Sequence, residues 1–115
     1  MIPKPPKRVL VVEDDPSIRE VLCMVLSMDG HQVEEAANAE EALSKCDSEV
    51  DVVLTDYLMA GMKGDELAKA IKQRYPSKTI IMVTGFPPEH PPEEVSQVVL
   101  KPFNTEFLRR VVVEG

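Results

Sequence analysis

Residues 8–16 read Arg-Val-Leu-Val-Val-Glu-Asp-Asp-Pro, an apolar run that changes abruptly into three acidic residues and a proline. A short continuous apolar run is typical of a strand that is covered on both faces, so we predict a buried strand over 8–12. Asp15 is a candidate N-cap, and Pro16 suits the first position of a helix. The stretch therefore predicts a strand, an acidic loop and a helix in immediate succession.

The same alternation continues along the rest of the chain. We predict further strands over 31–36, 50–55, 79–83 and 95–100, and helices over 16–28, 39–46, 65–75 and from 105 onward. Apolar residues recur at helical spacing in three of these helices: Ile18, Val21, Leu22, Val25 and Leu26; Leu67, Ala68 and Ile71; Phe107, Leu108 and Val111. Asn38 and Glu41 form a capping box, and Asn104 can cap the last helix. Strands that alternate with helices pair in parallel, which predicts a doubly wound α/β fold.

Composition limits the range of functions. The chain has 115 residues, of which 43% are hydrophobic, and a formal net charge of -7, which suits one folded domain that does not bind nucleic acid nonspecifically. No apolar run approaches the roughly 20 residues of a membrane helix, and no signal peptide is recognisable, so we expect a soluble, cytoplasmic protein without membrane contact. Cys23 and Cys46 are too few and too far apart for a disulfide scaffold or a zinc site, and we interpret both as small apolar residues.

Polar side chains follow four of the five predicted strands: Glu13 and Asp14, then Asp56, Thr84 and Lys101. In doubly wound folds the ligand lies beyond the carboxyl ends of the strands, so we expect these side chains to face one crevice. Taken singly, each has an ordinary structural explanation as a cap, a loop residue, a turn former or a surface lysine. Their occurrence at the ends of four of the five predicted strands favours a common site.

The chemistry of such a crevice can be predicted from its charges. Three carboxylates in close proximity repel one another, and a divalent cation removes that repulsion. Mg²⁺ prefers oxygen ligands, one or two carboxylates among them, and retains several waters. One carboxylate is then available as a nucleophile that accepts a phosphoryl group. Lys101 would pair with one phosphoryl oxygen, and the Thr84 hydroxyl would donate to another.

Five motifs together resemble the receiver domain of two-component response regulators. They are VVEDDP (11–16), LTDYLM (54–59), GMKG (61–64), VTG (83–85) and LKPF (100–103). The resemblance implies a flavodoxin-like, five-stranded parallel sheet with helices on both faces. It implies a receiver domain over residues 8–115, preceded by a leader rich in Pro and Lys over residues 1–7.

The same resemblance implies roles for particular residues. Asp56 would accept a phosphoryl group from a sensor histidine kinase and then control a downstream protein or fused effector through a change of conformation. Asp14 would bind Mg²⁺ directly, Glu13 would act through bound water, and Asp56 and the backbone carbonyl of Leu58 would complete the metal site. Thr84 would be the switch hydroxyl and Lys101 the phosphate-pairing lysine, joined to Pro102 by a cis peptide. Such a domain is a signalling module that catalyses only its own phosphorylation and dephosphorylation.

Two departures from the family pattern concern the output. The position three residues before Lys101, usually aromatic in the family, is Val98. Residues 86–92 contain four prolines, which forbid a regular helix, so the fourth helix of the family is predicted to be short or missing. The sequences TGF (84–86) and KPF (101–103) also resemble receivers of hybrid histidine kinases. The chain is compatible both with a stand-alone regulator and with a receiver from a longer protein.

Alternatives come from different functional classes. A pseudo-receiver would keep the fold and bind a partner without phosphoryl turnover. The two departures favour this alternative, and the intact set of Glu13, Asp14, Asp56, Thr84 and Lys101 opposes it. An aspartyl-phosphate phosphatase usually has a second Asp two residues after its nucleophile, where this chain has Leu58. A nucleotide-binding domain needs a glycine-rich turn after the first strand, where this chain has an acidic one.

Overall fold

A five-stranded parallel sheet in the order β2-β1-β3-β4-β5 forms the centre of the computed structural model, which describes residues 5–115. The strands are β1 (Arg8–Val12), β2 (Gln32–Ala36), β3 (Val52–Thr55), β4 (Thr79–Thr84) and β5 (Gln97–Leu100). The helices are α1 (Pro16–Ser27), α2 (Ala39–Lys45), α3 (Gly64–Arg74) and α4 (Thr105–Glu114). This strand order is that of a flavodoxin-like doubly wound sheet, so the predicted fold class is confirmed. Residues 1–4 of the predicted leader lie outside the described part of the chain.

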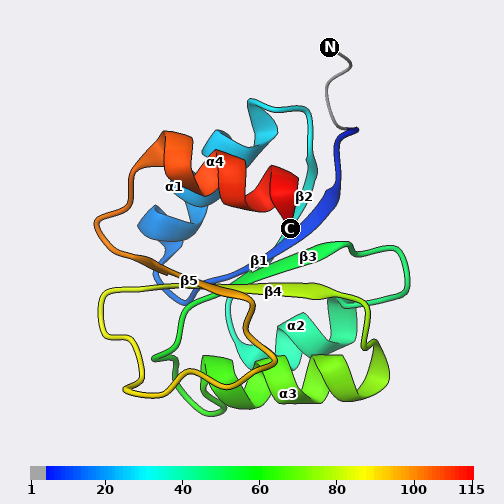
Figure 1. Cartoon of the computed structure of the whole chain (residues 1–115), viewed down its shortest axis with the longest axis vertical. Coiled ribbons are helices and arrows are strands. Elements are labelled where there is room, and N and C mark those ends of the chain that lie inside the picture. The colour runs from blue at the N-terminus through cyan, green and yellow to red at the C-terminus, as the bar shows by residue number, and fades with distance from the viewer. Residues whose placement is uncertain (1–4) are drawn as a thin grey trace.

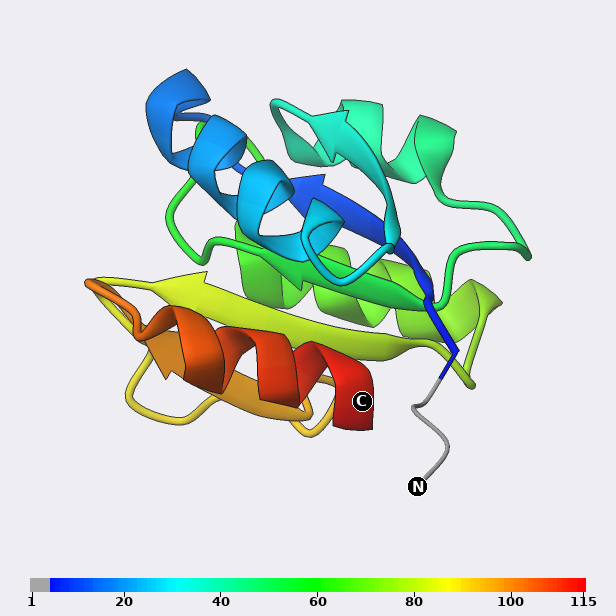
Figure 2. The same cartoon turned by 90° about the horizontal axis from the view of Figure 1, so that it is seen from above.

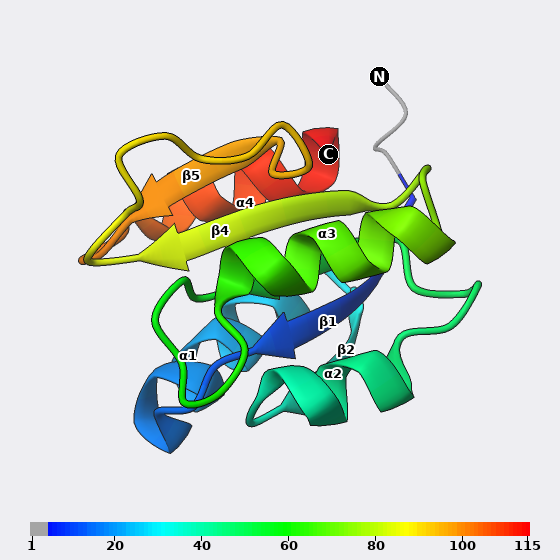
Figure 3. The same ribbon diagram turned by 90° about the horizontal axis from the view of Figure 1, so that it is seen from below.

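The helices form a layer on each face of the sheet. Helices α1 and α4 cover one face, and α2 and α3 cover the other (Figures 1, 2 and 3). Side chains of β1 alternate accordingly: Val9 and Val11 join the core on the side of α1 and α4, whereas Leu10 and Val12 join the core on the opposite side. A strand covered in this way needs apolar residues at every position, which explains the continuous run over residues 9–12.

The predicted caps begin three of the four helices. Asp15 accepts hydrogen bonds from the backbone amides of Ser17 and Ile18 at 2.9 and 3.3 Å, and Asn38 accepts one from Glu41 at 2.8 Å. Asn104 accepts one from the amide of Phe107 at 3.0 Å. The capping box at α2 differs slightly from the prediction, because the Glu41 carboxylate accepts from the amide of residue 37 rather than from that of Asn38.

Two residues of the predicted apolar faces are exposed instead of buried. Val21 of α1 is 47% exposed, while its neighbours Leu22, Val25 and Leu26 are buried. Phe107 of α4 is 37% exposed, and Val112 takes the buried position beside Leu108. Each helix packs on the sheet along one narrow stripe, and an apolar residue about 100° away from that stripe faces solvent.

Several element boundaries differ from the prediction by one or two residues. β3 and β5 begin at Val52 and Gln97, so Val50 and Val95 precede the strands although both are buried. Their amides donate to the carbonyls of Asp47 and Pro92 within turns. At these two positions an apolar residue therefore indicates a buried side chain, although the residue is not part of a strand. Similarly, β2 begins at residue 32 instead of 31, and α3 spans residues 64–74 instead of 65–75.

The connection between β4 and β5 contains no helix in the structure, as the prolines predicted. Residues 85–96 form bends and turns that run alongside β5 (Figure 3). The helix labelled α4 therefore follows β5 and corresponds to the fifth helix of the expected pattern. The Lys101–Pro102 peptide is cis, as the resemblance implied. Within the described residues, no helix combines the length and apolar character needed to cross a membrane.

Both cysteines are free thiols that pack among apolar residues. Cys46 is buried in the core on the side of α2 and α3, and Cys23 packs against the core on the side of α1 and α4. Burial raises the pKa of the Cys23 thiol to about 11, and burial also raises the pKa of Cys46. Their interpretation as small apolar residues is confirmed.

Candidate functional site

The predicted polar residues meet at the carboxyl edge of the sheet. Glu13 follows β1, Asp56 follows β3, Thr84 ends β4 and Lys101 follows β5. The backbone hydrogen bonds of the sheet continue to these positions: the amide of Asp56 donates to the carbonyl of Val12 at 3.2 Å, and that of Lys101 donates to the carbonyl of Thr84 at 3.0 Å. These candidate residues therefore lie at or directly beyond the strand ends, where backbone hydrogen bonds to the neighbouring strands hold them.

Lys101 connects two of the carboxylates. Its ammonium nitrogen lies 2.5 Å from Glu13 Oε1 and 2.9 Å from Asp56 Oδ2. Glu13 is only 1% exposed, so its carboxylate depends on this ammonium group and on the amide of Asp15, which donates to Oε2 at 3.3 Å. Charged groups that are this buried need such partners.

The charges shift the ionisation of the buried residues. Burial by itself lowers the pKa of Lys101, but hydrogen bonds to Glu13 and Asp56 outweigh it, and the net pKa is raised. Burial is the main cause that raises the pKa of Glu13; the neighbouring Asp14 adds to it, and Lys101 opposes it. Both directions follow from one arrangement, in which Glu13 is buried beside Asp14 and the Lys101 ammonium group lies between the carboxylates of Glu13 and Asp56.

The carboxylates of Glu13, Asp14 and Asp56 are the residues that could hold a metal ion. One carboxylate oxygen from each lies within 4.8 Å of the others. Glu13 is buried, Asp56 is half-buried and Asp14 is exposed, so the cluster opens to solvent on the side of Asp14. A set of hard oxygen donors with an open side fits Mg²⁺, which retains water ligands.

The backbone around Asp56 is tightly packed. The amide of Tyr57 donates to Asp56 Oδ1 at 2.6 Å, and the Thr55 hydroxyl donates to the backbone carbonyl of Asp56 at 2.9 Å. Gly64, at the start of α3, packs directly against this backbone, and a Cβ atom at Gly64 would lie 2.1 Å from the Asp56 carbonyl oxygen. Leu58 lies in the loop between β3 and α3 with an exposed side chain.

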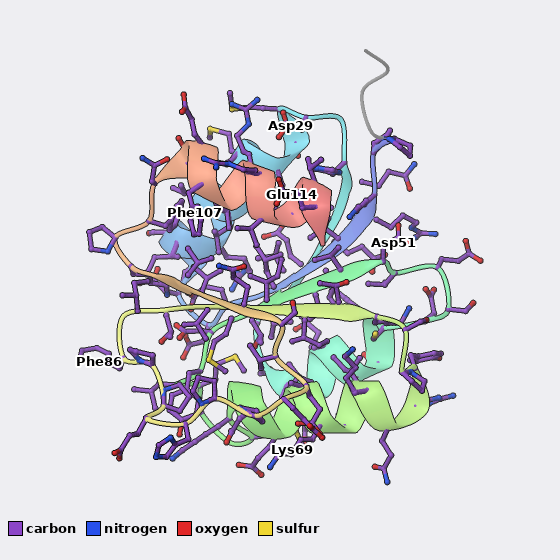
Figure 4. The ribbon with its side chains drawn as sticks, in the orientation of Figure 1. Asp29, Asp51, Lys69, Phe86, Phe107 and Glu114 are labelled. Carbon is purple, nitrogen blue, oxygen red and sulfur yellow. The ribbon has the colours of Figure 1, made fainter. Side chains whose placement is uncertain are left out.

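Thr84 is buried at the same edge of the sheet, with its hydroxyl close to the following loop. Its Oγ1 accepts a hydrogen bond from the amide of Phe86 at 3.2 Å, which leaves the hydroxyl proton available for a second partner. Phe86 itself is 73% exposed and points away from the body of the molecule (Figure 4). Val98 of β5 is half-buried and packs against the core on the side of α2 and α3.

Arg19 also contacts the site, and the sequence did not predict this contact. Its Nη1 donates to the backbone carbonyl of Glu13 at 2.7 Å, six residues back along the chain. One signal was present, since Arg19 is the first basic residue after an acidic loop. A basic residue in the first turns of a helix is ordinarily a solvated surface residue, so the contact was not predicted.

Comparisons with known proteins agree with this geometry. Residues 9–113 match the protein family described as the response regulator receiver domain. A cyclic di-GMP phosphodiesterase of Thermotoga maritima is 35% identical over 106 residues, which cover 88% of this chain and 28% of that protein. The chain therefore spans less than a third of the length of this curated relative.

Two solved structures match over nearly their whole length. Chemotaxis protein CheY4 of Vibrio cholerae is 31% identical with a TM-score of 0.86, over 96% of this chain and 98% of that one. The response regulator protein TrrA of Thermotoga maritima, in complex with Mg²⁺ and BeF, is 33% identical with a TM-score of 0.86, over 94% and 97% of the two chains.

Proposed function

The chain belongs to the family of response regulator receiver domains, and from this membership we propose that it is a Mg²⁺-dependent phosphoacceptor switch with Asp56 as the acceptor. Receiver domains are signalling modules of two-component systems. We assign the receiver domain to residues 8–115, the donor to a sensor histidine kinase, and the reaction to the cytoplasm. The observation that carries the proposal is the contact of Lys101 with both Glu13 and Asp56 at the open acidic edge of the sheet.

In the proposed reaction, a carboxylate oxygen of Asp56 attacks the phosphorus of the donor phosphohistidine. The new P–O bond forms as the P–N bond breaks, and the electron pair of the P–N bond leaves with the donor imidazole. Lys101 already lies against Asp56, so its ammonium group can pair with an oxygen of the incoming phosphoryl group. Thr84 can donate its hydroxyl proton to another oxygen while its Oγ1 still accepts from Phe86.

Glu13, Asp14, Asp56 and the carbonyl of Leu58 are the groups that we propose for the metal site. A bound Mg²⁺ would supply positive charge next to the phosphoryl oxygens, which phosphoryl transfer requires. The donor set supports this assignment, because the three carboxylates lie close together and one side of the cluster is open to water.

A pseudo-receiver remains the second candidate, and two features of the structure favour it. Val98 replaces the usual aromatic residue of the fifth strand, and residues 85–96 contain no helix. Both features alter the output of the switch and leave the acidic edge unaffected. The two candidates therefore differ in one measurable property, the phosphorylation of Asp56.

The test is the intact mass of the protein after incubation with a small-molecule phosphodonor. We expect a single phosphoryl adduct with Mg²⁺, no adduct with a chelator, and no adduct on Asp56→Asn with either. Asn is nearly isosteric with Asp and relieves crowding among the carboxylates, so this variant should fold normally, which circular dichroism checks.

A lack of adduct on the wild-type chain leads to a second measurement. Beryllofluoride with Mg²⁺ mimics the acylphosphate without a transfer step, so binding would show an intact site that rejects the chosen donor. If beryllofluoride also failed to bind, the phosphoacceptor proposal would be wrong, and the pseudo-receiver would be the better description.

A further inference from the structure

Arg19 reaches from α1 back to the acidic loop and is held at two points. Its Nη1 donates to the Glu13 carbonyl at 2.7 Å, and its Nε lies 3.2 Å from Glu35 Oε1 on β2. The Arg19 side chain is only 20% exposed. A planar guanidinium group with donors in a fixed fork can hold two acceptors at once, which makes Arg19 a rigid link between them.

The link completes the attachment of Glu13 to β2. The amide of Glu13 donates to the carbonyl of Ala36 at 3.0 Å, so the backbone nitrogen of Glu13 is bonded to β2 directly. The backbone carbonyl of Glu13 is bonded to β2 indirectly, because Arg19 donates both to this carbonyl and to the Glu35 side chain. Both backbone groups of Glu13 are therefore fixed with respect to the sheet.

Asp14 lies between two anchored residues. On one side is Glu13, and on the other is Asp15, whose carboxylate caps α1 by accepting from the amides of residues 17 and 18. The side chain of Asp14 is itself exposed. The backbone position of Asp14 consequently depends on how firmly its two neighbours are held.

We propose that Arg19 is a positioning residue for the metal site, one that orders Glu13 and Asp14 by holding the Glu13 carbonyl. This inference rests on the proposed function, because the metal site is part of that proposal. An acidic loop that is already ordered loses less conformational entropy when it binds a cation. Outer contacts that orient metal ligands typically change metal affinity by 10- to 100-fold when they are removed.

The experiment is a calorimetric titration with Mg²⁺ of the whole chain and three variants. Arg19→Met removes both hydrogen bonds, and Arg19→Lys keeps the charge and one donor group. Lys45→Met is the matched control, because Lys45 donates to the Glu35 carbonyl at 2.6 Å and pairs with Glu41 at 2.9 Å. It removes one positive charge that contacts the backbone of Glu35, the residue that also pairs with Arg19, and Lys45 makes no contact with Glu13.

We expect Arg19→Met to weaken Mg²⁺ binding about tenfold, at the low end of the range for such contacts. Arg19→Lys keeps the charge but cannot hold both acceptors, so it should also lose much of the affinity, whereas Lys45→Met should change it less than twofold. The inference would be overturned if Arg19→Met and Lys45→Met bound Mg²⁺ equally well. It would also be overturned if Arg19→Lys bound Mg²⁺ as tightly as the wild type, since a positive charge alone would then account for the affinity.

A second measurement separates positioning from folding. Hydrogen exchange in chelator should become faster at the amides of Asp14 and Asp15 in Arg19→Met, with the exchange of β3 unchanged. Uniformly faster exchange would indicate a purely structural role and contradict the inference. Should Arg19→Met fail to fold, Glu35→Ala removes the acceptor that holds the other end of the guanidinium group, and unchanged exchange at Asp14 would then overturn the inference. Because these exchange experiments need no metal, they remain decisive even if the wild-type chain bound no Mg²⁺ and the proposed function failed.

Discussion

Gly64 shows at the scale of one residue how the backbone near Asp56 constrains the sequence. A Cβ atom there would lie 2.1 Å from the carbonyl oxygen of Asp56 and 3.0 Å from the Cα of Tyr57. Both neighbours are backbone atoms, so a rotamer change cannot relieve the contact. We expect Gly64→Ala to lower the free energy of unfolding by about 2–3 kcal/mol, in the upper part of the range for overpacking.

Urea denaturation measures this effect, and Gly85→Ala provides the control. A Cβ atom at Gly85 would meet only Lys101 Cβ at 3.9 Å, which is an ordinary contact. We therefore expect Gly85→Ala to unfold at nearly the wild-type urea concentration. Equal stability of the two variants would show that the start of α3 moves freely with respect to Asp56. Slower phosphorylation of Gly64→Ala under folding conditions would further link this packing to the site.

At the scale of elements, an ion pair joins the end of α1 to α4. Arg109 Nε and Nη2 lie 2.9 and 2.6 Å from the two carboxylate oxygens of Asp29, which is located just beyond α1 (Figure 4). The hydrogen bond from Arg109 lowers the pKa of Asp29 below its ordinary value of 3.8. The pair therefore stabilises the fold above that pH, and its contribution disappears as the pH falls through the lowered pKa.

We expect Asp29→Asn to lower the melting temperature slightly at pH 7 and to have no effect at a pH well below 3.8. The effect should be small because the pair is partly exposed. Melting temperatures of the wild type and Asp29→Asn across this pH range test the prediction. Asp47→Asn is the control, because it removes the same charge from an exposed residue elsewhere. The difference in melting temperature between Asp47→Asn and the wild type should not change with pH. A difference between wild type and Asp29→Asn that stayed constant with pH would contradict an ionic origin.

At the scale of the whole molecule, the site lies at one edge of a sheet that is packed on both faces. Close-packed cores change shape little, so a signal from Asp56 should leave through the loops at this edge. Thr84 connects directly to the loop over residues 85–96, through its hydroxyl bond to Phe86, and Lys101 bonds to the Thr84 carbonyl. This loop itself contains no helix, and position 98 of β5 is a valine instead of an aromatic residue.

We expect Mg²⁺ with beryllofluoride to shift the backbone amide resonances of residues 84–95 and of Lys101. Resonances at the opposite edge of the sheet, around residues 43–46 and 70–75, should change little. Heteronuclear NMR spectra with and without beryllofluoride measure both sets, and the spectrum with Mg²⁺ alone is the control. If residues 84–95 kept their resonances on activation, this loop would not be the output segment.

Local sequence patterns predicted much of this molecule. Continuous apolar runs predicted strands that are covered on both faces, and Asp15, Asn38 and Asn104 marked helix starts that the structure confirms. The order of polar residues after the strands predicted which side chains meet, because parallel strands bring their carboxyl ends to one edge. These features depend on neighbours in the chain or on the regular geometry of a sheet, and a sequence specifies both directly.

Burial of polar groups was decided only by the tertiary structure. Lys78 is a lysine in a turn, yet it is buried, donates to the carbonyl of Val50 and lies 4.6 Å above the ring of Tyr75. Arg19 binds the backbone of Glu13, whereas Val21, two positions later on α1, faces solvent. Such contacts depend on the distance and angle between elements after packing. Residue type and spacing determine which element forms and which face is apolar, but the partner of a long polar side chain exists only once the layers have come together.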